Sequence, residues 1–451
     1  MENETRNCQN CKQGFEIDAQ DFDFYKKMYV PPPTWCPDCR LQRRLIWRNE
    51  RALYRRKCDA PGHTEELISY IAPEKPHTVY DQKYWWSDAW DATAYGRDYD
   101  FSKPFFSQFK ELMETVPRSS LSTDYQTMIN SDYSNWAGQL RNCYLVTDAD
   151  YVENSAYSSS IFKSKDCLDC DNALESELCY DCFDIEKCYR AVSSYNCNAC
   201  SDIYFSVNCS NCANCFGCVN LRGRSYYIFN EPYSKEGYTD KMKEIYDGSY
   251  ESYRAAFKAA AERSLLYPRK FARGLMNKNV SGDYAYNSKN VAYGFLITNV
   301  EDSKFVALTH CASTKDCYDY TDWGENVQLL YECIACGLGV ANSKFSNLLI
   351  KESDRCEYCY FSVNCANCFG CASLRKKQYC ILNKQYTKEE YEELVPKILK
   401  HMDEMPYIDA KGRVYKYGEF FPSEVSPFSY NESAAQEFFP ITKEKALASG
   451  Y

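Results

Sequence analysis

The sequence predicts a mainly β protein: a duplicated parallel β-helix, or β-solenoid, with helical caps and a zinc ribbon at its N-terminus. Three observations predict this fold class: paired cysteines near the start of the chain, an ordered internal duplication, and a regular cysteine spacing within the first copy. The chain has 451 residues, of which 45% are hydrophobic, and this is enough to bury the cores of two or three domains.

The composition indicates a soluble protein with reduced thiols. No stretch approaches the roughly 18 apolar residues that a membrane span needs, and the first residues lack the apolar core of a signal peptide. The 27 cysteines are odd in number and many stand in Cys-x-x-Cys pairs, which favours metal ligands or buried thiols over a disulfide framework. We therefore expect a cytoplasmic protein with no membrane partner.

Two Cys-x-x-Cys pairs predict a metal site in the N-terminal module, residues 1–57. Cys8 and Cys11 form the first pair, Cys36 and Cys39 form the second, and 24 residues separate the pairs. Two such pairs supply the four thiolates that Zn²⁺ binds tetrahedrally at about 2.3 Å. Four protein ligands close the coordination sphere, so we expect one zinc ion with a structural role.

Beyond the cysteines, about the first 45 residues resemble a bacterial zinc-ribbon family with a treble-clef-like plan. The residues that carry the resemblance are Phe15-x-Ile17, Asp23-Phe24-Tyr25, Pro33 and Cys36-Pro37-x-Cys39-Arg40. With Arg48-Asn49-Glu50-Arg51 and Trp85-Trp86-Ser87-Asp88 included, the chain is similar to an uncharacterised family of cysteine-rich repeat proteins of candidate-phyla bacteria. The resemblance implies an architecture and no activity.

The resemblance would also imply a second set of paired cysteines after the arginine-rich segment. Only one of them, Cys58, is present in this sequence. The other places hold Pro61, Asp81 and Tyr84. A partial site formed by Cys58, His63 and His77 is one interpretation, and a free thiol beside two loop histidines is the other.

A basic segment follows the second cysteine pair. The chain carries a formal charge of −10, but residues 34–57 hold eight basic and two acidic residues, a local charge of +6. No Pro or Gly occurs from Arg40 to Lys57, and arginines recur every three or four residues, so a helix there would place guanidinium groups on one face. The candidate nucleic-acid-binding residues are Arg40, Arg43, Arg44, Arg48, Arg51, Arg55 and Arg56.

Three partners suit this row of arginines. Guanidinium groups bind phosphates and stack on bases, which favours nucleic acid, and the many aromatic residues favour RNA or a ribonucleoprotein. Alternatively, the arginines pair with the acidic remainder of the same chain, which carries −16, or with an acidic protein surface.

Residues 58–130 form an aromatic connector with one predicted helix. Its clustered aromatic residues are Tyr84, Trp85, Trp86, Trp90 and Tyr95. We expect this cluster to pack the N-terminal module onto the body, with stacking on a ligand as the alternative. From Phe105 to Val116 apolar residues recur at helical spacing, and Pro117 ends the helix.

The rest of the chain contains an internal duplication. Two segments recur in order: Tyr204–Cys209 as Tyr360–Cys365, and Ala213–Cys218 as Ala366–Cys371. The predicted first repeat, helical insert, second repeat, and capping helix with C-terminal tail are residues 131–230, 231–280, 281–385 and 386–451. Thr387-x-x-Glu390 predicts the start of the capping helix, which Pro396 would break or bend.

A shorter spacing predicts the coils of the first repeat. Cys167, Cys188 and Cys209 follow one another at intervals of 21 residues, and the same interval separates Cys179 from Cys200. A coil of about 21 residues with three short sides would place each strand on its counterpart one turn later and stack cysteine on cysteine. Asn and Asp would occupy the corners because they tolerate turn conformations.

One cysteine run is an alternative metal site, formed by Cys209, Cys212, Cys215 and Cys218. Its Cys-x-x-Cys-x-x-Cys start is typical of iron–sulfur ligation, but its fourth spacing differs and no proline follows. We favour buried structural thiols, because consecutive cysteines of an extended coil would point in different directions. A redox or metal-handling protein with an iron–sulfur cluster or extra zinc is the alternative function.

Enzymatic constellations are sparse in this sequence. It has four histidines, no dinucleotide-binding fingerprint and no phosphate-binding glycine loop. A β-helix carbohydrate-active enzyme is a further alternative. Its carboxylates would come from Asp148, Asp150 and Glu153, or from Asp181 and Glu332. We expect a non-enzymatic zinc-binding scaffold or adaptor whose N-terminal module contacts RNA, a ribonucleoprotein or an acidic protein surface.

Overall fold

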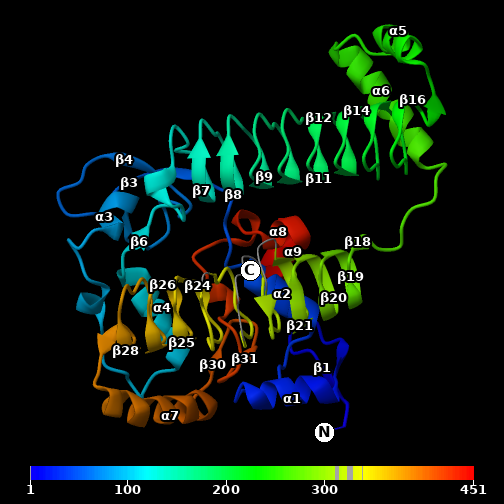
Figure 1. The fold of residues 1–451 in the computed structure, drawn as a ribbon. Coiled ribbons are helices and arrows are strands. Elements are labelled where there is room, and N and C mark those ends of the chain that lie inside the picture. The colour runs from blue at the N-terminus through cyan, green and yellow to red at the C-terminus, as the bar shows by residue number, and fades with distance from the viewer. Residues whose placement is uncertain (1, 310–313, 322–328, 338) are drawn as a thin grey trace.

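The described chain is mainly β and is built around two stacks of parallel strands (Figure 1). The computed structural model describes residues 2–309, 314–321, 329–337 and 339–451. The first stack runs outward to a pair of helices, and the chain returns along the second stack in the opposite direction, so that the stacks lie one above the other. Within these described ranges, no helix combines the length and the apolar character needed to cross a membrane.

The first stack extends from β7 to β16. Its strands are β7 (Asn135–Arg141), β8 (Thr147–Glu153), β9 (Ser159–Phe162), β10 (Asp171–Leu174), β11 (Phe183–Glu186), β12 (Tyr189–Val192), β13 (Tyr195–Asn198), β14 (Ser201–Tyr204), β15 (Ala213–Phe216) and β16 (Ser225–Ile228). They pair in parallel, and a short strand, β17 (Glu231–Pro232), then pairs antiparallel with β16. This last strand covers the open edge of the sheet, which would otherwise be free to pair with another chain.

The second stack extends from β18 to β28 and ends in the same way. Its strands are β18 (Gly274–Leu275), β19 (Lys278–Tyr286), β20 (Lys289–Thr298), β21 (Val300–Lys304), β22 (Ala307–Thr309), β23 (Thr314–Lys315), β24 (Asn347–Ile350), β25 (Asp354–Glu357), β26 (Tyr360–Val363), β27 (Ala366–Phe369) and β28 (Gln378–Ile381). The final strand, β29 (Lys384–Gln385), is antiparallel to β28.

Each turn of the first stack contains 12 residues, the separation of Cys170 from its hydrogen-bond partner Ser158 one turn earlier. Asp171 pairs with Ser159 before it and with Phe183 after it, and a bridge on another side of the turn joins Tyr144 to Ala156. Turns of the second stack contain 11 to 14 residues. The longer, three-sided coil predicted from the cysteine spacing is therefore wrong.

A three-residue unit explains both the true turn and the misleading spacing. From Trp136 to Asn214 every third residue has a positive φ, and the residue that follows it points inward. Four such units make one turn. Because the spacing of Cys167 and Cys188 is a multiple of three but not of a whole turn, both point inward from different sides. Cys167 and Cys179, which are one turn apart, occupy the same side.

Asn and Asp occupy many of the left-handed corners, as the sequence predicts. Asn208, Asn211 and Asn214, for example, have φ values of 55°, 52° and 53°. The left-handed backbone conformation costs most L-residues roughly 1–2 kcal/mol. Asn and Asp tolerate this conformation best because their side chains form local hydrogen bonds. The amide of Asn142 also donates to Asn154 one turn later, at 3.0 Å.

The inward serine and cysteine side chains both donate hydrogen bonds to backbone carbonyl groups of their own turn. The Oγ of Ser158 donates to the carbonyl of Ala156 at 3.0 Å, and the Sγ of Cys170 donates to the carbonyl of Leu168 at 3.4 Å. The Oγ of Ser158 also accepts the backbone N–H of Cys170 at 3.0 Å, one turn later. Both side chains are thus satisfied by the wall of their own stack, so that the stack buries them at little cost.

A helix lies against the last strand of each stack. α5 (Lys235–Ile245) contacts β16, α6 (Tyr250–Ser264) follows it, and α7 (Lys388–Glu404) contacts β28. Thr387 begins α7 with the predicted capping box. The expectation from the sequence is a break or a bend at Pro396, and the helix continues through this residue without a break.

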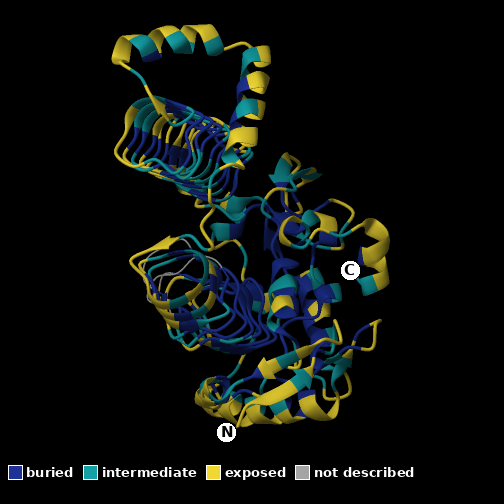
Figure 2. Cartoon of the chain, turned by 90° about the vertical axis from the view of Figure 1, so that its right-hand side faces the viewer, coloured by how far each residue is buried: buried dark blue, intermediate teal, exposed yellow. Residues whose placement is uncertain are grey.

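The N-terminal module, the connector and the C-terminal tail surround the second stack. Their elements are β1 (Glu4–Asn7), β2 (Gly14–Ile17), α1 (Ala19–Lys27), α2 (Pro37–Leu45), β3 (Tyr54–Lys57), β4 (Glu66–Ser69), β5 (Val79–Tyr80), α3 (Gln82–Trp86), α4 (Phe105–Thr115), β6 (Arg118–Ser119), β30 (Tyr407–Ile408), β31 (Val414–Tyr415), α8 (Ala435–Phe438), α9 (Lys443–Ser449) and the 3₁₀ helices Ala92–Tyr95, Tyr125–Thr127, Ser423–Val425 and Tyr430–Glu432. One hydrophobic core joins these parts to the second stack, whereas the first stack has a core of its own (Figure 2).

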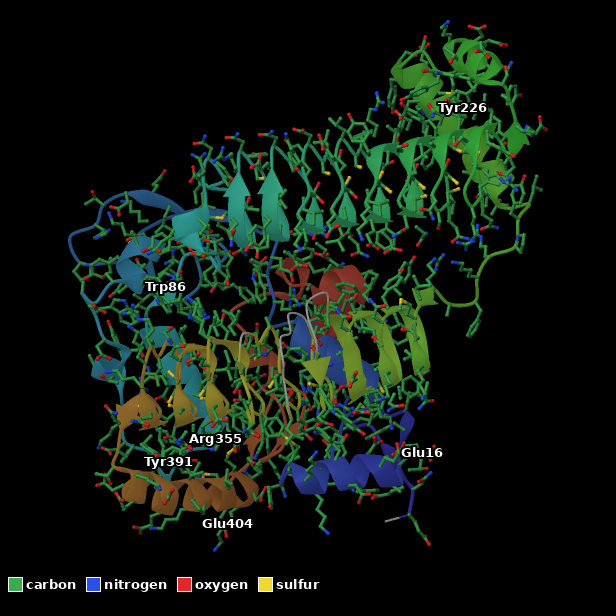
Figure 3. The ribbon with its side chains drawn as sticks, viewed as in Figure 1. Glu16, Trp86, Tyr226, Arg355, Tyr391 and Glu404 are labelled. Atoms are coloured by element: carbon green, nitrogen blue, oxygen red, sulfur yellow. The ribbon has the colours of Figure 1, made fainter. Side chains whose placement is uncertain are left out.

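The aromatic connector packs onto the second stack, as predicted. Trp85 is fully buried and stacks on Phe361 of β26 with ring centroids 4.7 Å apart. Its neighbour Trp86 (Figure 3) meets the same indole edge-on at 4.9 Å. The predicted helix at Phe105 is also confirmed, as α4.

The arginine helix predicted over residues 40–57 forms only at its start. α2 ends at Leu45, and residues 54–57 form β3. Asn49 explains the interruption, because its side chain accepts the backbone N–H of Ala52 and donates to the carbonyl of Ala52, both at 2.9 Å. An Asn side chain that bonds the backbone in this way competes with helical hydrogen bonds.

Candidate metal centre and the buried arginine network

The two predicted cysteine pairs meet at one site in the N-terminal module. The sulfur atoms of Cys8, Cys11, Cys36 and Cys39 all lie within 4.8 Å of one another. The Cys11 and Cys36 sulfurs are 3.7 Å apart, close to the edge of about 3.8 Å expected for four sulfurs placed about 2.3 Å from a zinc ion. The arrangement is compatible with a bound metal ion held by four protein ligands.

Local backbone structure holds these four sulfurs in place. Cys8 directly follows β1, and Cys36 is the N-cap residue of α2. The backbone N–H of Cys36 donates to the Sγ of Cys8 at 3.3 Å, and the amide of Asn10 donates to the Sγ of Cys39 at 3.3 Å. Donors directed at sulfur favour the thiolate form that binds metal.

The helix that begins at this site inserts its arginines into the protein. Arg40, Arg43 and Arg44 of α2 and the nearby Arg48 are at most 2% exposed. Sequence reasoning identified these residues but treated them as an exposed row. The predicted guanidinium face is therefore wrong for these four arginines in the folded chain.

The arginines of α2 form ion pairs with three carboxylates. Arg43 donates one Nη to both oxygens of Glu332 at 2.8 Å and the other Nη to Glu419 at 2.9 Å. Asp319 accepts from Arg40 at 2.8 Å and from Arg44 at 3.1 Å. Asp319 and Glu332 belong to the second stack, whereas Glu419 belongs to the C-terminal tail. α2 is thus fixed to both.

Aromatic rings complete the pockets around these cations. The guanidinium of Arg43 lies 4.3 Å from the ring of Trp35, and that of Arg40 lies 5.2 Å from the ring of Phe305. Arg48 lies 4.7 Å from the ring of Trp136, at the start of the first stack, and also forms an ion pair with Glu50. The arrangement corresponds to the predicted alternative in which the arginines pair with acidic groups of the same chain.

The remaining three arginines lie outside this network. Arg51 and Arg55 are exposed and Arg56 is half-buried. Arg51 faces Glu437 at 3.5 Å, Arg55 donates to the hydroxyl of Tyr133 at 3.3 Å, and Arg56 pairs with Asp59.

The structure does not gather the alternative cysteine set into a metal site. Cys209, Cys212, Cys215 and Cys218 point inward from the four sides of one turn and are at most 2% exposed. Sequence reasoning expected such cysteines to point in different directions, but a three-residue unit turns all of them inward. Among the described residues, they belong to no group of three or more candidate ligands whose ligand atoms all lie within 4.8 Å of one another. Each sulfur instead donates to the carbonyl two residues earlier.

Of the carboxylates considered for glycan cleavage, Asp181 and Glu332 lie in different stacks. Asp181 of the first stack accepts a hydrogen bond from Tyr253 of α6 at 2.9 Å. Glu332 is buried against Arg43 in the second stack. Asp148, Asp150 and Glu153 lie on β8, where Ser160 donates to Asp148 at 2.7 Å.

Burial of the thiols leads to a direct prediction. Of the 26 described cysteines, all but Cys11 are buried (sulfur atoms appear yellow in Figure 3). Of the 26 described thiols we expect at most one to react rapidly with a thiol reagent such as Ellman's reagent in the native protein, and we expect all 27 thiols of the chain to react after denaturation.

A chelator provides the control for that measurement. It should release only cysteines that hold a metal ion, the four of the N-terminal module among them, while the thiols of the two stacks stay unreactive. Rapid reaction of many thiols without denaturant would contradict the closed stacks.

A comparison of the chain with protein-family models and with curated proteins finds no match. The resemblance of the first module to zinc ribbons is therefore supported here by the cluster of four cysteines alone. Sequence reasoning missed Asp319 and Glu419. The acidic remainder of the chain gave a general signal for such partners, but nothing local marks either residue.

Proposed function

We propose that this protein is a non-enzymatic scaffold or adaptor in which a structural zinc ion fixes the N-terminal module to a duplicated β-solenoid. The observation that carries the proposal is the course of α2. Its N-cap and first turn supply Cys36 and Cys39, and the same helix carries Arg40, Arg43 and Arg44. An ion bound at the start of α2 would therefore fix the position of the buried ion pairs.

The parallel pairing of residues one turn apart supports the assignment of both stacks as β-solenoids. A solenoid forms a stiff rod because each turn is bonded to the next. The first stack has a core separate from the rest of the chain, and this supports its role as a projecting arm.

The surface of the first stack supports a protein partner. Residues 131–230 hold thirteen acidic and seven basic residues, a formal charge of −6. Exposed tyrosines, among them Tyr144, Tyr157 and Tyr180, lie on the same stack. Exposed aromatic rings among acidic groups suit a basic protein surface better than a polyanion.

Contact with RNA is not part of this proposal. Four of the seven arginines on which it depended are buried in ion pairs, and only Arg51 and Arg55 of the seven are exposed. A phosphate backbone cannot reach the buried four without unfolding α2 from the second stack.

Metal content, visible absorbance and limited proteolysis together test the proposed function. Protein purified without added metal should contain zinc and no iron, and should not absorb in the visible range. Chelation should expose residues 1–57 to protease while the first stack stays protected, and added zinc should restore protection. Iron with visible colour would support the redox alternative, and unchanged proteolysis after zinc removal would contradict a structural role.

A further inference from the structure

We propose a second zinc site formed by Cys58, His63, Glu65 and Asp81. Their ligand atoms lie within 4.8 Å of one another. The Sγ of Cys58 is 3.7 Å from Oδ2 of Asp81, which in turn is 3.3 Å from Nδ1 of His63. If a tetrahedral zinc ion is bound by a sulfur at about 2.3 Å and by an oxygen at about 2.0 Å, that sulfur and that oxygen lie about 3.5 Å apart, close to the distance between Cys58 and Asp81.

The backbone holds the four side chains together. Cys58 directly follows β3, and its N–H donates to the carbonyl of Glu65 at 3.1 Å, which closes the loop that precedes β4. Within the loop the N–H of His63 donates to the carbonyl of Ala60 at 3.0 Å. Asp81 is the N-cap residue of α3. Two strand ends and a helix start thus direct sulfur, nitrogen and oxygen atoms at one point.

This arrangement has the same plan as the first metal centre. In both places an antiparallel strand pair precedes a helix whose N-cap residue is a candidate ligand, Cys36 for α2 and Asp81 for α3. In both, the backbone N–H of that N-cap residue donates to the sulfur of a cysteine that directly follows the first strand. The N–H to Sγ distance is 3.3 Å for Cys8 and 3.3 Å for Cys58.

One carboxylate oxygen of Asp81 caps a helix, and this hydrogen bond orients the other oxygen. Oδ1 of Asp81 accepts the backbone N–H of Tyr84 at 3.0 Å and so caps α3. Oδ2 is the oxygen directed at Cys58 and His63. The ring of Tyr84 meets the His63 ring edge-on at 4.9 Å and limits its rotation. A ligand whose other atoms are held in this manner binds metal with little loss of freedom.

Charge also favours a cation at this point. The ion pairs of both Glu65 and Asp81 are with His63, at 2.6 and 3.3 Å. A divalent ion at this point would take the place of these contacts. One thiolate, one imidazole and two carboxylates form a mixed set that zinc accepts.

The site differs from the partial site considered from the sequence. His77 does not belong to this group of ligand atoms, and its Nδ1 faces the carbonyl of Met113 at 3.2 Å. Glu65 and Asp81 take the remaining positions. The proposal does not rest on the four-cysteine centre, and each site can exist without the other.

Metal stoichiometry tests this proposal with a matched pair of variants. After equilibration with zinc and gel filtration, the wild-type chain should hold two zinc ions. The double variant His63→Ala, Glu65→Gln should hold one. Glu66→Gln, which changes the neighbouring exposed carboxylate at the start of β4, should keep two. Both changed residues of the double variant lie in a solvent-accessible loop, so it should melt at the wild-type temperature in the absence of metal.

Cobalt substitution gives a second readout that separates the two sites. Removal of the mixed site should take away the weaker cobalt signal of a single thiolate, while the strong sulfur-to-cobalt charge-transfer band of the four-cysteine centre remains. Asp81→Asn, which keeps the N-cap oxygen, should give the same loss. The same zinc content in the wild-type chain and in the double variant would overturn the proposal. Failure of the first centre would be seen separately, as a Cys39→Ser variant that loses no metal.

Discussion

Replacing Arg43 with alanine is expected to destabilise the folded chain by about 3–5 kcal/mol. The substitution leaves Glu332 and Glu419 facing each other, both almost fully buried and without the cation that now contacts both. A buried charge without its partner costs far more than an ion pair on the surface contributes. Urea unfolding followed by tryptophan fluorescence would measure the effect, because Trp35 packs directly on Arg43.

Arg55→Ala is the matched control for that change. Arg55 is exposed, and its loss should change stability by less than about 0.5 kcal/mol. Adding Glu332→Gln and Glu419→Gln to Arg43→Ala should recover part of the lost stability, because the orphaned charges are removed. Equal effects of Arg43→Ala and Arg55→Ala would contradict the buried network.

The pH dependence of the Arg43→Ala variant has a defined sign. Burial raises the pKa of Glu332, and the charge of Arg43 opposes that rise. Without Arg43 the pKa of Glu332 rises further. A carboxyl group with a raised pKa in the folded state favours folding when protonated and opposes folding as the pH rises through that pKa. The stability deficit of the variant should therefore shrink as the pH is lowered towards 5.

Local signals in the sequence sufficed for several elements. The four cysteines of the first centre, the capping box at Thr387 and the helix at Phe105 follow from short-range spacing, and the structure contains all three. Each depends on residues close together in the chain, where the chemistry of a cap or a ligand pair is visible in a few letters.

The turn length of the stacks was not recoverable from cysteines alone. Inward positions such as Cys167 and Cys170 alternate with Ser155 and Ser158 one turn earlier, because a hydroxyl and a thiol make the same hydrogen bond to the wall. The cysteines alone occupy the inward positions irregularly, so their spacing suggests a false period. If Cys, Ser and the other small inward residues are treated as one class, the true turn length becomes visible in the sequence.

Whether the arginines are buried or exposed depends on contacts with residues far away in the chain, which no local sequence pattern predicts. Arg43 and Glu332 are 289 residues apart in the chain. A helix rich in arginine has the same sequence whether it faces solvent or three buried carboxylates. Only the folded chain places Asp319 and Glu332, both at left-handed corners of the second stack, opposite α2.

Replacing Cys39 with serine should remove one metal equivalent and release α2 from the second stack. Structural zinc contributes roughly 10–16 kcal/mol of apparent binding free energy in small zinc-finger peptides, so the first turn of α2 should lose its anchor. Because Arg43 and Arg44 lie only one turn further along the same helix, the ion pairs with Glu332 and Asp319 should weaken together with the metal site. Cleavage within residues 1–57 by a protease should accelerate by roughly tenfold or more, since each loss of about 1.4 kcal/mol of stability raises the open population tenfold.

Cys212→Ser provides the comparison that isolates metal binding from cysteine chemistry. Cys212 is an inward residue of the first stack, and its sulfur donates to the carbonyl of Ser210 at 3.3 Å. A serine hydroxyl makes that same bond elsewhere in the stack, as Ser158 does, so this variant should keep its metal content and lose less than about 1 kcal/mol. If Cys39→Ser behaved like Cys212→Ser, the four-cysteine centre would be a packing feature, and the arginine network alone would hold the N-terminal module in place.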